Sequence, residues 1–159
     1  MVGGLITLVV VLAVASAAGF VLRQRQGRFR TVPAGPGPAA DGPVAPPPPP
    51  GNALDAADLG APLGARATLV QFSTEVCAYC GPTRQLLTEV AGERDGVAFV
   101  EIDAAARMDL TRRLHVMATP TVLVLDAAGG ITSRASGPVR KADLMSALGH
   151  TLHAGEGIS

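Results

Sequence analysis

The chain has 159 residues, of which 48% are hydrophobic, and its formal charge at neutral pH is zero. This length suits one domain of modest size with additional segments. The chain contains no Trp, one Tyr and four Phe, without interleaved basic and aromatic residues, so we expect no nucleic-acid surface. Two cysteines are too few for a secreted scaffold that is held together by many disulfides.

Residues 1–22 form an apolar segment without a charged side chain, and about 20 such residues cross a bilayer as a helix. A cleaved signal peptide is the alternative, but it would carry basic residues before its apolar core. Here the basic residues follow the apolar core, as arginines at positions 23, 25, 28 and 30. We therefore expect a single-pass anchor in the cell membrane, and the positive-inside rule places the rest of the chain in the cytoplasm.

Residues 23–52 are predicted to be a basic juxtamembrane segment followed by a linker rich in Pro, Gly and Ala. The five consecutive prolines at 46–50 favour a stiff polyproline II conformation. A ligand for an SH3-type domain is the alternative, but no basic residue flanks the prolines to set its orientation. We interpret the segment as a spacer that holds a folded domain off the membrane.

The folded domain is expected at residues 53–154, and residues 155–159 are expected to form a disordered tail. Asp55 is typical of the N-cap of a short helix that ends at Leu59. Apolar periodicity then predicts strands at 67–72, 97–102, 121–125 and 131–135, and helices at 77–91, 106–114 and 141–153. The β-α-β order predicts a mixed sheet with parallel first strands, an antiparallel hairpin at the end, and helices on both faces.

Cys77 and Cys80 lie one turn apart, directly after the first of these strands. At the start of a helix, a thiol close to the unpaired amide groups and the positive end of the helix dipole is favoured in its thiolate form. The second thiol would lie one turn deeper, where it can attack a mixed disulfide. The spacing therefore predicts a redox centre.

A zinc site and a structural disulfide are the two alternative roles for the cysteine pair. A zinc site would need His150 and His153, which lie far along the chain and do not have the spacing of a zinc finger. A purely structural disulfide is disfavoured, because so short a loop removes little entropy from the unfolded chain. We expect no metal, and His115 is assigned to a loop or helix end without a catalytic role.

Three segments of the chain resemble the thioredoxin family. They are LVQF at 69–72 leading to EVCAYC at 75–80, VEID at 100–103, and VMATPTVLVL at 116–125, and they occur in the family's order. The resemblance covers roughly residues 54–153. It implies an α/β, thioredoxin-like fold with a central mixed β-sheet flanked by helices, here preceded by one transmembrane helix and the Pro-rich linker.

The resemblance also implies roles for four positions. Cys77 would be the exposed nucleophile and Cys80 the resolving thiol. Pro120 matches the cis-proline of the family, and the backbone of Thr119 would pair with an extended substrate segment. From the residues alone, Pro120 could equally be an ordinary trans proline that starts a strand.

The positions around the cysteines differ in part from the family's pattern. Ala78 and Tyr79 lie between the cysteines, where they are expected to contact substrate and to influence the reduction potential. Gln71 occupies the position of a buried acid and cannot transfer a proton in its place. Ser73 and Val76 stand where tryptophans are usual, so the surface around the nucleophile is smaller and less aromatic.

The resulting hypothesis is a monomeric, membrane-tethered oxidoreductase that reduces protein disulfides through a mixed disulfide on Cys77. It would need no cofactor, only a recycling reductase or dithiol. One alternative is an extracytoplasmic oxidant, isomerase or reductant of exported proteins. Another is a weakly redox-active thioredoxin-like binding module whose groove at Thr119 and Pro120 holds a partner.

Overall fold

The computed structural model describes residues 11, 12, 14, 16, 29–31 and 52–156. Within these ranges, no helix has the length and apolar character needed to cross a membrane. Most of the expected anchor at 1–22, most of the expected linker at 23–52, and residues 157–159 of the expected tail lie outside the described residues. The anchor, the linker and the domain boundaries therefore stay predictions.

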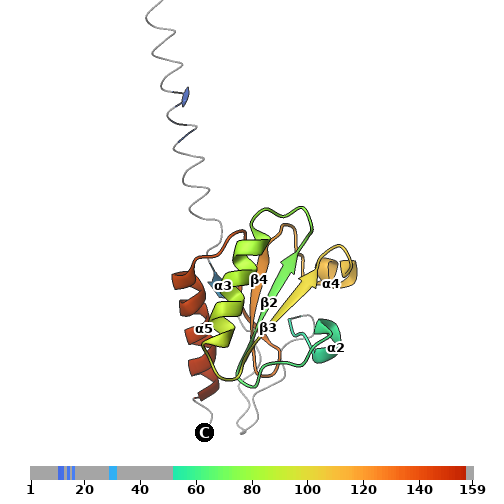
Figure 1. Ribbon diagram of the computed structural model, residues 1–159, viewed down its shortest axis with the longest axis vertical. Coiled ribbons are helices and arrows are strands. Elements are labelled where there is room, and N and C mark those ends of the chain that lie inside the picture. The colour runs from blue at the N-terminus through green and yellow to red at the C-terminus, as the bar shows by residue number, and fades with distance from the viewer. Residues whose placement is uncertain (1–10, 13, 15, 17–28, 32–51, 157–159) are drawn as a thin grey trace, which may run out of the picture.

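The described part of the chain forms a mixed sheet with helices on both faces, as the sequence predicts (Figure 1). The strands lie in the order β1-β5-β4-β2-β3, with β2 parallel to β3 and every other neighbouring pair antiparallel. The strands are β1 (Arg30–Thr31), β2 (Ala67–Ser73), β3 (Val97–Asp103), β4 (Thr121–Asp126) and β5 (Ile131–Ser136). The helices are α2 (Ala56–Leu59), α3 (Cys80–Gly92), α4 (Met108–Arg113) and α5 (Lys141–Glu156).

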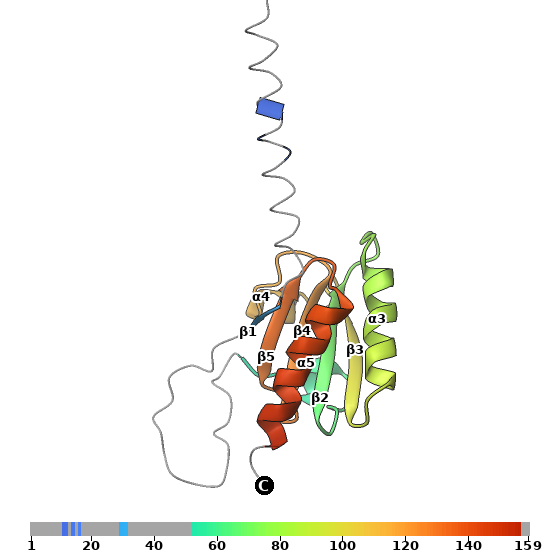
Figure 2. The same cartoon turned by 90° about the vertical axis from the view of Figure 1, so that its left-hand side faces the viewer.

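Each face of the sheet has its own hydrophobic core, because side chains along a strand point to alternate faces. On one face, β2 contributes Val70 and Phe72 to a cluster that includes Leu59 of α2 and Leu110 of α4. The other face is covered by α3 and α5 (Figure 2). Its buried helix residues lie at i, i+3 or i+4 spacing, as a helix with one buried side requires, and are Leu87, Val90, Leu144, Ala147, Leu148 and Leu152.

Helix boundaries differ from the predictions at three places. The helix predicted from Cys77 begins at Cys80, because residues 77–79 form a turn in which the Cys80 amide donates to the Cys77 carbonyl (3.3 Å). The helix predicted from residue 106 begins at Met108, since Asp103 accepts hydrogen bonds from the amides of residues 105 and 106 and holds a turn there. The last helix continues to Glu156, two residues into the expected tail.

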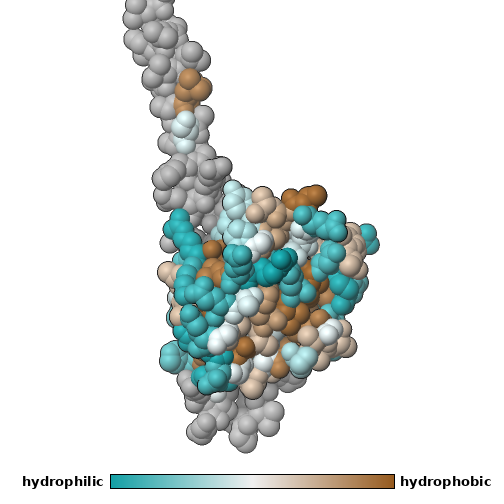
Figure 3. Space-filling model, in the orientation of Figure 1, coloured by the Kyte–Doolittle hydropathy of each residue, from teal (hydrophilic) through white to brown (hydrophobic). Residues whose placement is uncertain are grey.

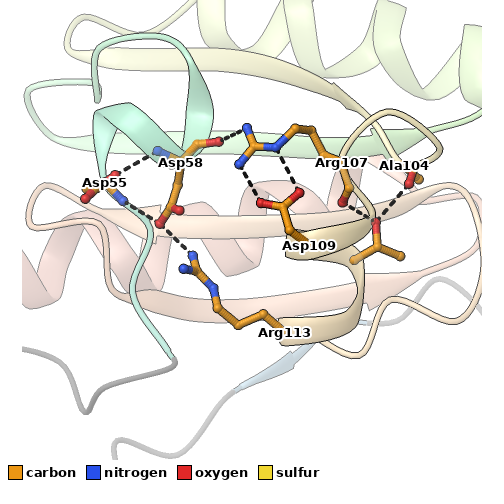
Figure 4. Close-up of polar contacts among 7 residues, drawn as sticks. Asp55, Asp58, Ala104, Arg107, Asp109 and Arg113 are labelled. Carbon is orange, nitrogen blue, oxygen red and sulfur yellow. Dashed lines mark hydrogen bonds and ion pairs between the residues drawn. The ribbon is translucent and has the colours of Figure 1, made fainter.

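A polar network joins α2 to α4 (Figure 4). Asp55 is the N-cap, as predicted, and forms a reciprocal capping box with Asp58. Arg107 donates from Nη1 to the Asp58 carbonyl (2.6 Å) and also pairs with Asp109, while Arg113 reaches Oδ2 of Asp58 (2.5 Å). The short helix is therefore fixed at its start by its own cap and at its side by two arginines.

Strand β1 is a feature that the sequence did not indicate. Residues 29–31 fall in the segment expected to be juxtamembrane or linker, yet Arg30 and Thr31 pair with Arg134 and Ser133 of β5, and Phe29 packs against the core under α3 and α5. The guanidinium of Arg134 donates hydrogen bonds to the backbone carbonyls of Leu114 and His115, which follow α4. These residues belong to the folded sheet, which corrects the linker assignment at 29–31.

Candidate functional site

Cys77 and Cys80 are joined by a disulfide at the point where β2 leads into α3, with their Cα atoms 5.4 Å apart. The two residues differ in accessibility. Cys80, the first residue of α3, is 2% exposed, whereas Cys77 precedes the helix in the turn and is half-buried. A partner thiol can therefore approach Cys77 more readily than Cys80.

The start of α3 provides a favourable electrostatic environment for a sulfur anion. Its N-cap residue, Tyr79, makes no side-chain capping hydrogen bond, and no acidic residue lies in the first turn of the helix. Pro82 lies in the first turn, where its missing N–H costs little. In the reduced protein, the positive end of the helix dipole would stabilise a thiolate on Cys77.

The loop that precedes β4 lies next to the loop that carries the disulfide. The peptide bond between Thr119 and Pro120 is cis, so the conformation expected from the resemblance is confirmed. The hydroxyls of Thr74 and Thr119 are 3.1 Å apart and hydrogen-bonded, which joins the two loops. The substrate-binding roles of Thr119 and Pro120 stay predictions.

Apolar side chains are exposed around the disulfide. Val76 is 95% exposed, Tyr79 is 56% exposed, and Met117, two residues before Thr119, is 90% exposed. In Figure 3, a brown hydrophobic group protrudes at the upper end of the folded domain among paler and teal residues, where Figure 1 shows the loop between β2 and α3. Exposed large apolar side chains on the loops around a site offer contact surface to a partner. We call Val76, Tyr79 and Met117 the apolar rim.

A hollow of about 320 Å³ adjoins the cis-proline loop. Its walls come from the end of β2, the turn before α4, α4 itself and the cis-proline loop. The lining residues are Thr74, Ala104, Ala105, Met108, Thr111, Val116, Met117, Ala118 and Thr119. Met108 and Met117 are not recognisable as site residues in the sequence. Their only signal was an apolar side chain at the edge of an element, which is also typical of core residues.

Gln71 lies beneath the disulfide and is completely buried. Its Nε2 donates to the carbonyl of Cys80 (2.9 Å), which fixes the orientation of the amide, while its Oε1 has no partner among the described residues. The side chain thus ties the centre of β2 to the first residue of α3. Being a neutral amide, it neither takes up nor releases a proton at ordinary pH.

An ion pair on the same face of the sheet lies next to Gln71. Glu101 is the neighbour of Gln71 in the β2–β3 register, and Arg84 is one turn after Cys80 on α3. Arg84 binds Glu101 through two hydrogen bonds of 2.6 and 2.7 Å. These bonds hold the pKa of Glu101 below its usual value against the effect of partial burial, and the Ser73 hydroxyl lowers it further.

The histidines lie apart from the cysteines. His115 is exposed after α4 with a positive φ of 49°, and both His150 and His153 are exposed on α5. Within the described ranges, no three or more His, Cys, Asp or Glu side chains come together in a way that could hold a metal ion.

Comparisons with known proteins cover the same region. The sequence profile of the family described as Thioredoxin matches residues 61–150. No curated protein matches the chain.

Several solved structures are similar to part of this chain. Thioredoxin-2 of a malaria parasite, described as a component of its protein secretion machinery, has 16% identity and a TM-score of 0.51 over 58% of this chain and 90% of its own. This likeness supports the fold. Chloroplastic thioredoxin z has 27% identity and a TM-score of 0.49 over 55% of this chain and 79% of its own. A thioredoxin from Fasciola hepatica has 22% identity and a TM-score of 0.49 over 55% and 83%.

Proposed function

This chain belongs to the thioredoxin family, and from this premise we propose that it reduces protein disulfides through Cys77 and Cys80. A thioredoxin domain with a C-x-x-C pair is consistent with thiol-disulfide oxidoreductase activity. The observation that carries the proposal is the unequal accessibility of the two cysteines, with Cys77 half-buried in the turn and Cys80 buried at the start of α3. The sulfur of Cys77 can contact the substrate while the sulfur of Cys80 stays buried beside Cys77.

The reaction begins from the dithiol form. The thiolate of Cys77 attacks one sulfur of the substrate disulfide, so a bond forms between Cys77 and the substrate and the substrate S–S bond breaks. The displaced sulfur leaves as a thiolate and takes up a proton. The deprotonated thiol of Cys80 then attacks Cys77 and releases the second substrate sulfur. Two electrons have passed to the substrate, the Cys77–Cys80 disulfide is closed, and an external dithiol must reduce it again.

The buried amide of Gln71 sets a condition on the second step. Because an amide cannot accept the proton of Cys80, this proton passes to solvent or to the departing substrate thiolate. The amide still holds the Cys80 carbonyl and so keeps the resolving thiol at the helix start. Gln71 is thus a positioning residue in this proposal.

The surroundings of the disulfide favour an extended, partly apolar substrate segment. Its backbone would pair with Thr119 beside Pro120, and Ala78 and Tyr79 would contact it from the other loop. The hollow next to Thr119 has room for an apolar side chain. The apolar rim would cover the residues that flank the substrate cysteine.

For the cellular location, we propose a membrane anchor at residues 1–22 with the domain at the cytoplasmic face. The arginines at 23, 25, 28 and 30 support this orientation, and net reduction is the direction expected in the cytoplasm. The opposite orientation would make the same site an oxidant, isomerase or reductant of exported proteins. Labelling of Cys77 in reduced intact cells with a membrane-impermeant thiol reagent distinguishes the two orientations.

The test of activity uses the full-length protein in detergent with insulin as the disulfide substrate and dithiothreitol as the recycling dithiol. We expect Cys77→Ser to abolish turnover and Cys80→Ser to accumulate a mixed disulfide on Cys77. Asp95→Ala, in the exposed turn before β3, is the control and should retain turnover. Binding of an extended peptide without turnover by the wild-type protein would instead indicate the binding module, which the amide at Gln71 favours.

A further inference from the structure

The N-terminal part of the chain joins the folded domain at Phe29. The ring of Phe29 packs on the core beneath α3 and α5, and Arg30 and Thr31 pair with β5. Whatever precedes residue 29 is therefore attached to the edge of the sheet. The chain thus joins the domain at residues 29–31, before the continuous described part that starts at residue 52.

Both ends of the segment 32–51 lie at the start of β5. At one end, Thr31 is opposite Ser133. At the other end, the Asn52 carbonyl accepts a hydrogen bond from the Ile131 amide (2.9 Å). Ser133 and Ile131 are two residues apart on one strand, a distance of about 7 Å. The two described residues that flank this segment therefore lie close together on β5, and the N-terminal residues reach the domain at Phe29. The spacer role of residues 32–51 stays a prediction.

The N-terminal residues leave the domain at the end that carries the disulfide. β1 is antiparallel to β5 and β5 is antiparallel to β4, so β1 and β4 run in the same direction. β4 starts at Thr121, opposite Phe72 near the end of β2 and directly after Pro120. Arg30 is level with Leu123, about 7 Å from this end of the sheet. Figure 2 shows β1 beside β5 at the sheet edge.

The distances involved are short. The sheet order places β1 three strands from β2, which is about 14 Å across the sheet. From Leu22, the last apolar residue of the expected anchor, to Phe29 the chain can span at most about 25 Å. A small folded domain is about 30 Å across. The gap between this end of the sheet and a bilayer that holds residues 1–22 would therefore be narrower than a small folded domain.

We propose that the disulfide end of the domain faces the membrane surface, and that its substrates are disulfides in extended segments of membrane proteins next to the bilayer. The proposal rests on the proposed thiol-disulfide exchange and on the membrane anchor at residues 1–22. A folded soluble client does not fit between the domain and the bilayer, whereas an extended juxtamembrane segment does. The apolar rim lies at this same end and provides the contact surface.

The orientation can be measured without any activity, because the protein contains no Trp. Val76→Trp places a donor beside the disulfide, and Ala127→Trp places one in the exposed β4–β5 turn at the opposite end. Full-length reduced variants are inserted into phosphatidylcholine and phosphatidylglycerol vesicles with and without dansyl-labelled headgroups. We expect severalfold more energy transfer to lipid from position 76 than from position 127. Equal or reversed transfer overturns the orientation, and no transfer from either position overturns the anchor and the proposal with it.

The substrate class is tested by insertion of a Gly-Ser segment at one of two places. One insertion follows Gly27, between the expected anchor and β1, and the matched insertion follows Ala40, between β1 and the rest of the domain. The substrates are a lipid-anchored disulfide peptide in the same vesicles and soluble insulin. We expect only the first insertion to raise insulin reduction severalfold and to remove the preference for the anchored peptide.

A larger effect of the second insertion, or a wild-type protein that already prefers insulin, overturns the proposed substrate class. If neither substrate is reduced even in detergent, the proposed activity fails. The energy-transfer result then still decides the orientation, so the two failures are distinguishable.

Discussion

At Gln71, a completely buried amide holds the start of α3 by its bond to the Cys80 carbonyl, while its own oxygen has no partner in the described part of the chain. We expect Gln71→Glu to make stability depend on pH. A protonated Glu can still donate to the Cys80 carbonyl, but an ionised one cannot, and burial raises the pKa of a carboxyl group above its unfolded value. The variant is then close to wild type below about pH 4 and loses about 2 kcal/mol as the pH rises toward the folded pKa.

Urea unfolding of full-length protein in detergent at pH 4 and pH 8 measures this effect. Gln71→Leu is the control, because it removes the hydrogen bond and the unpartnered oxygen without adding a titratable group. The free energy of unfolding of Gln71→Leu should differ from that of the wild type by the same amount at both pH values. Equal stability of the Gln71→Glu variant at the two pH values would show that the site is open to water.

Arg84 and Glu101 give a pH dependence of the opposite sign. Since Arg84 lowers the pKa of Glu101, the pair stabilises the fold above the usual carboxyl pKa, and this stabilisation is lost as the pH falls through the lowered value. Arg84→Met should therefore reduce the free energy of unfolding at pH 7 but have little effect near pH 2. Arg112→Met, an exposed arginine on α4, is the control and should show no such difference. An equal loss at both pH values would point to packing of the Arg84 stem instead.

The residues of the site were predictable to the extent that their chemistry is local. Cys77 and Cys80 are recognisable from type and spacing, and Pro120 only from the resemblance to the family. The hydrogen bond from Gln71 depends instead on which backbone group meets it in the folded chain. The hollow was not predictable either, because Met108 reaches it from a segment about thirty residues beyond the cysteines. Long-range contacts of this kind leave no periodic signal in the sequence.

Among the elements, α2 is a helix of only four residues and depends on its cap and on α4. We expect Asp58→Ala to reduce the free energy of unfolding by about 1 kcal/mol, because it removes half of the capping box and the partner of Arg113. Chemical unfolding measures the loss. Asp95→Ala, in the exposed turn before β3, is the control, and an equal effect of the two substitutions would contradict a specific role for the network.

The longer elements were predicted well for a physical reason. The continuous apolar runs of β2 and β4 mark strands that are buried on both faces, and the i, i+4 spacing in α3 and α5 identifies each helix and its buried side. The first turn of α3 was misplaced, because the turn at 77–79 carries no sequence signal that separates it from a helix start. β1 was missed altogether, since two residues cannot show a period, and only pairing with β5 makes them a strand.

At the scale of the whole molecule, the packing of Phe29 determines how the domain is oriented relative to the N-terminal residues. If β1 docks as described, its loss should free the domain from the N-terminal residues without unfolding it. We expect Phe29→Ser to speed amide hydrogen exchange at residues 29–31 and to reduce the difference in energy transfer between Trp at 76 and Trp at 127. Phe29→Leu keeps an apolar side chain at this position and should preserve both properties.

The main unfolding transition of the Phe29→Ser protein should remain cooperative, because the two cores beneath the helices are built almost entirely from residues 54–152. A global loss of folding would mean that β1 is part of the core stability itself. Unchanged exchange and unchanged energy transfer would mean that pairing of Arg30 and Thr31 with β5 holds the strand without its phenylalanine. The presentation of Cys77 to the membrane would then depend on backbone hydrogen bonds at the sheet edge, and substitution of Arg30 by Pro would be the change that releases it.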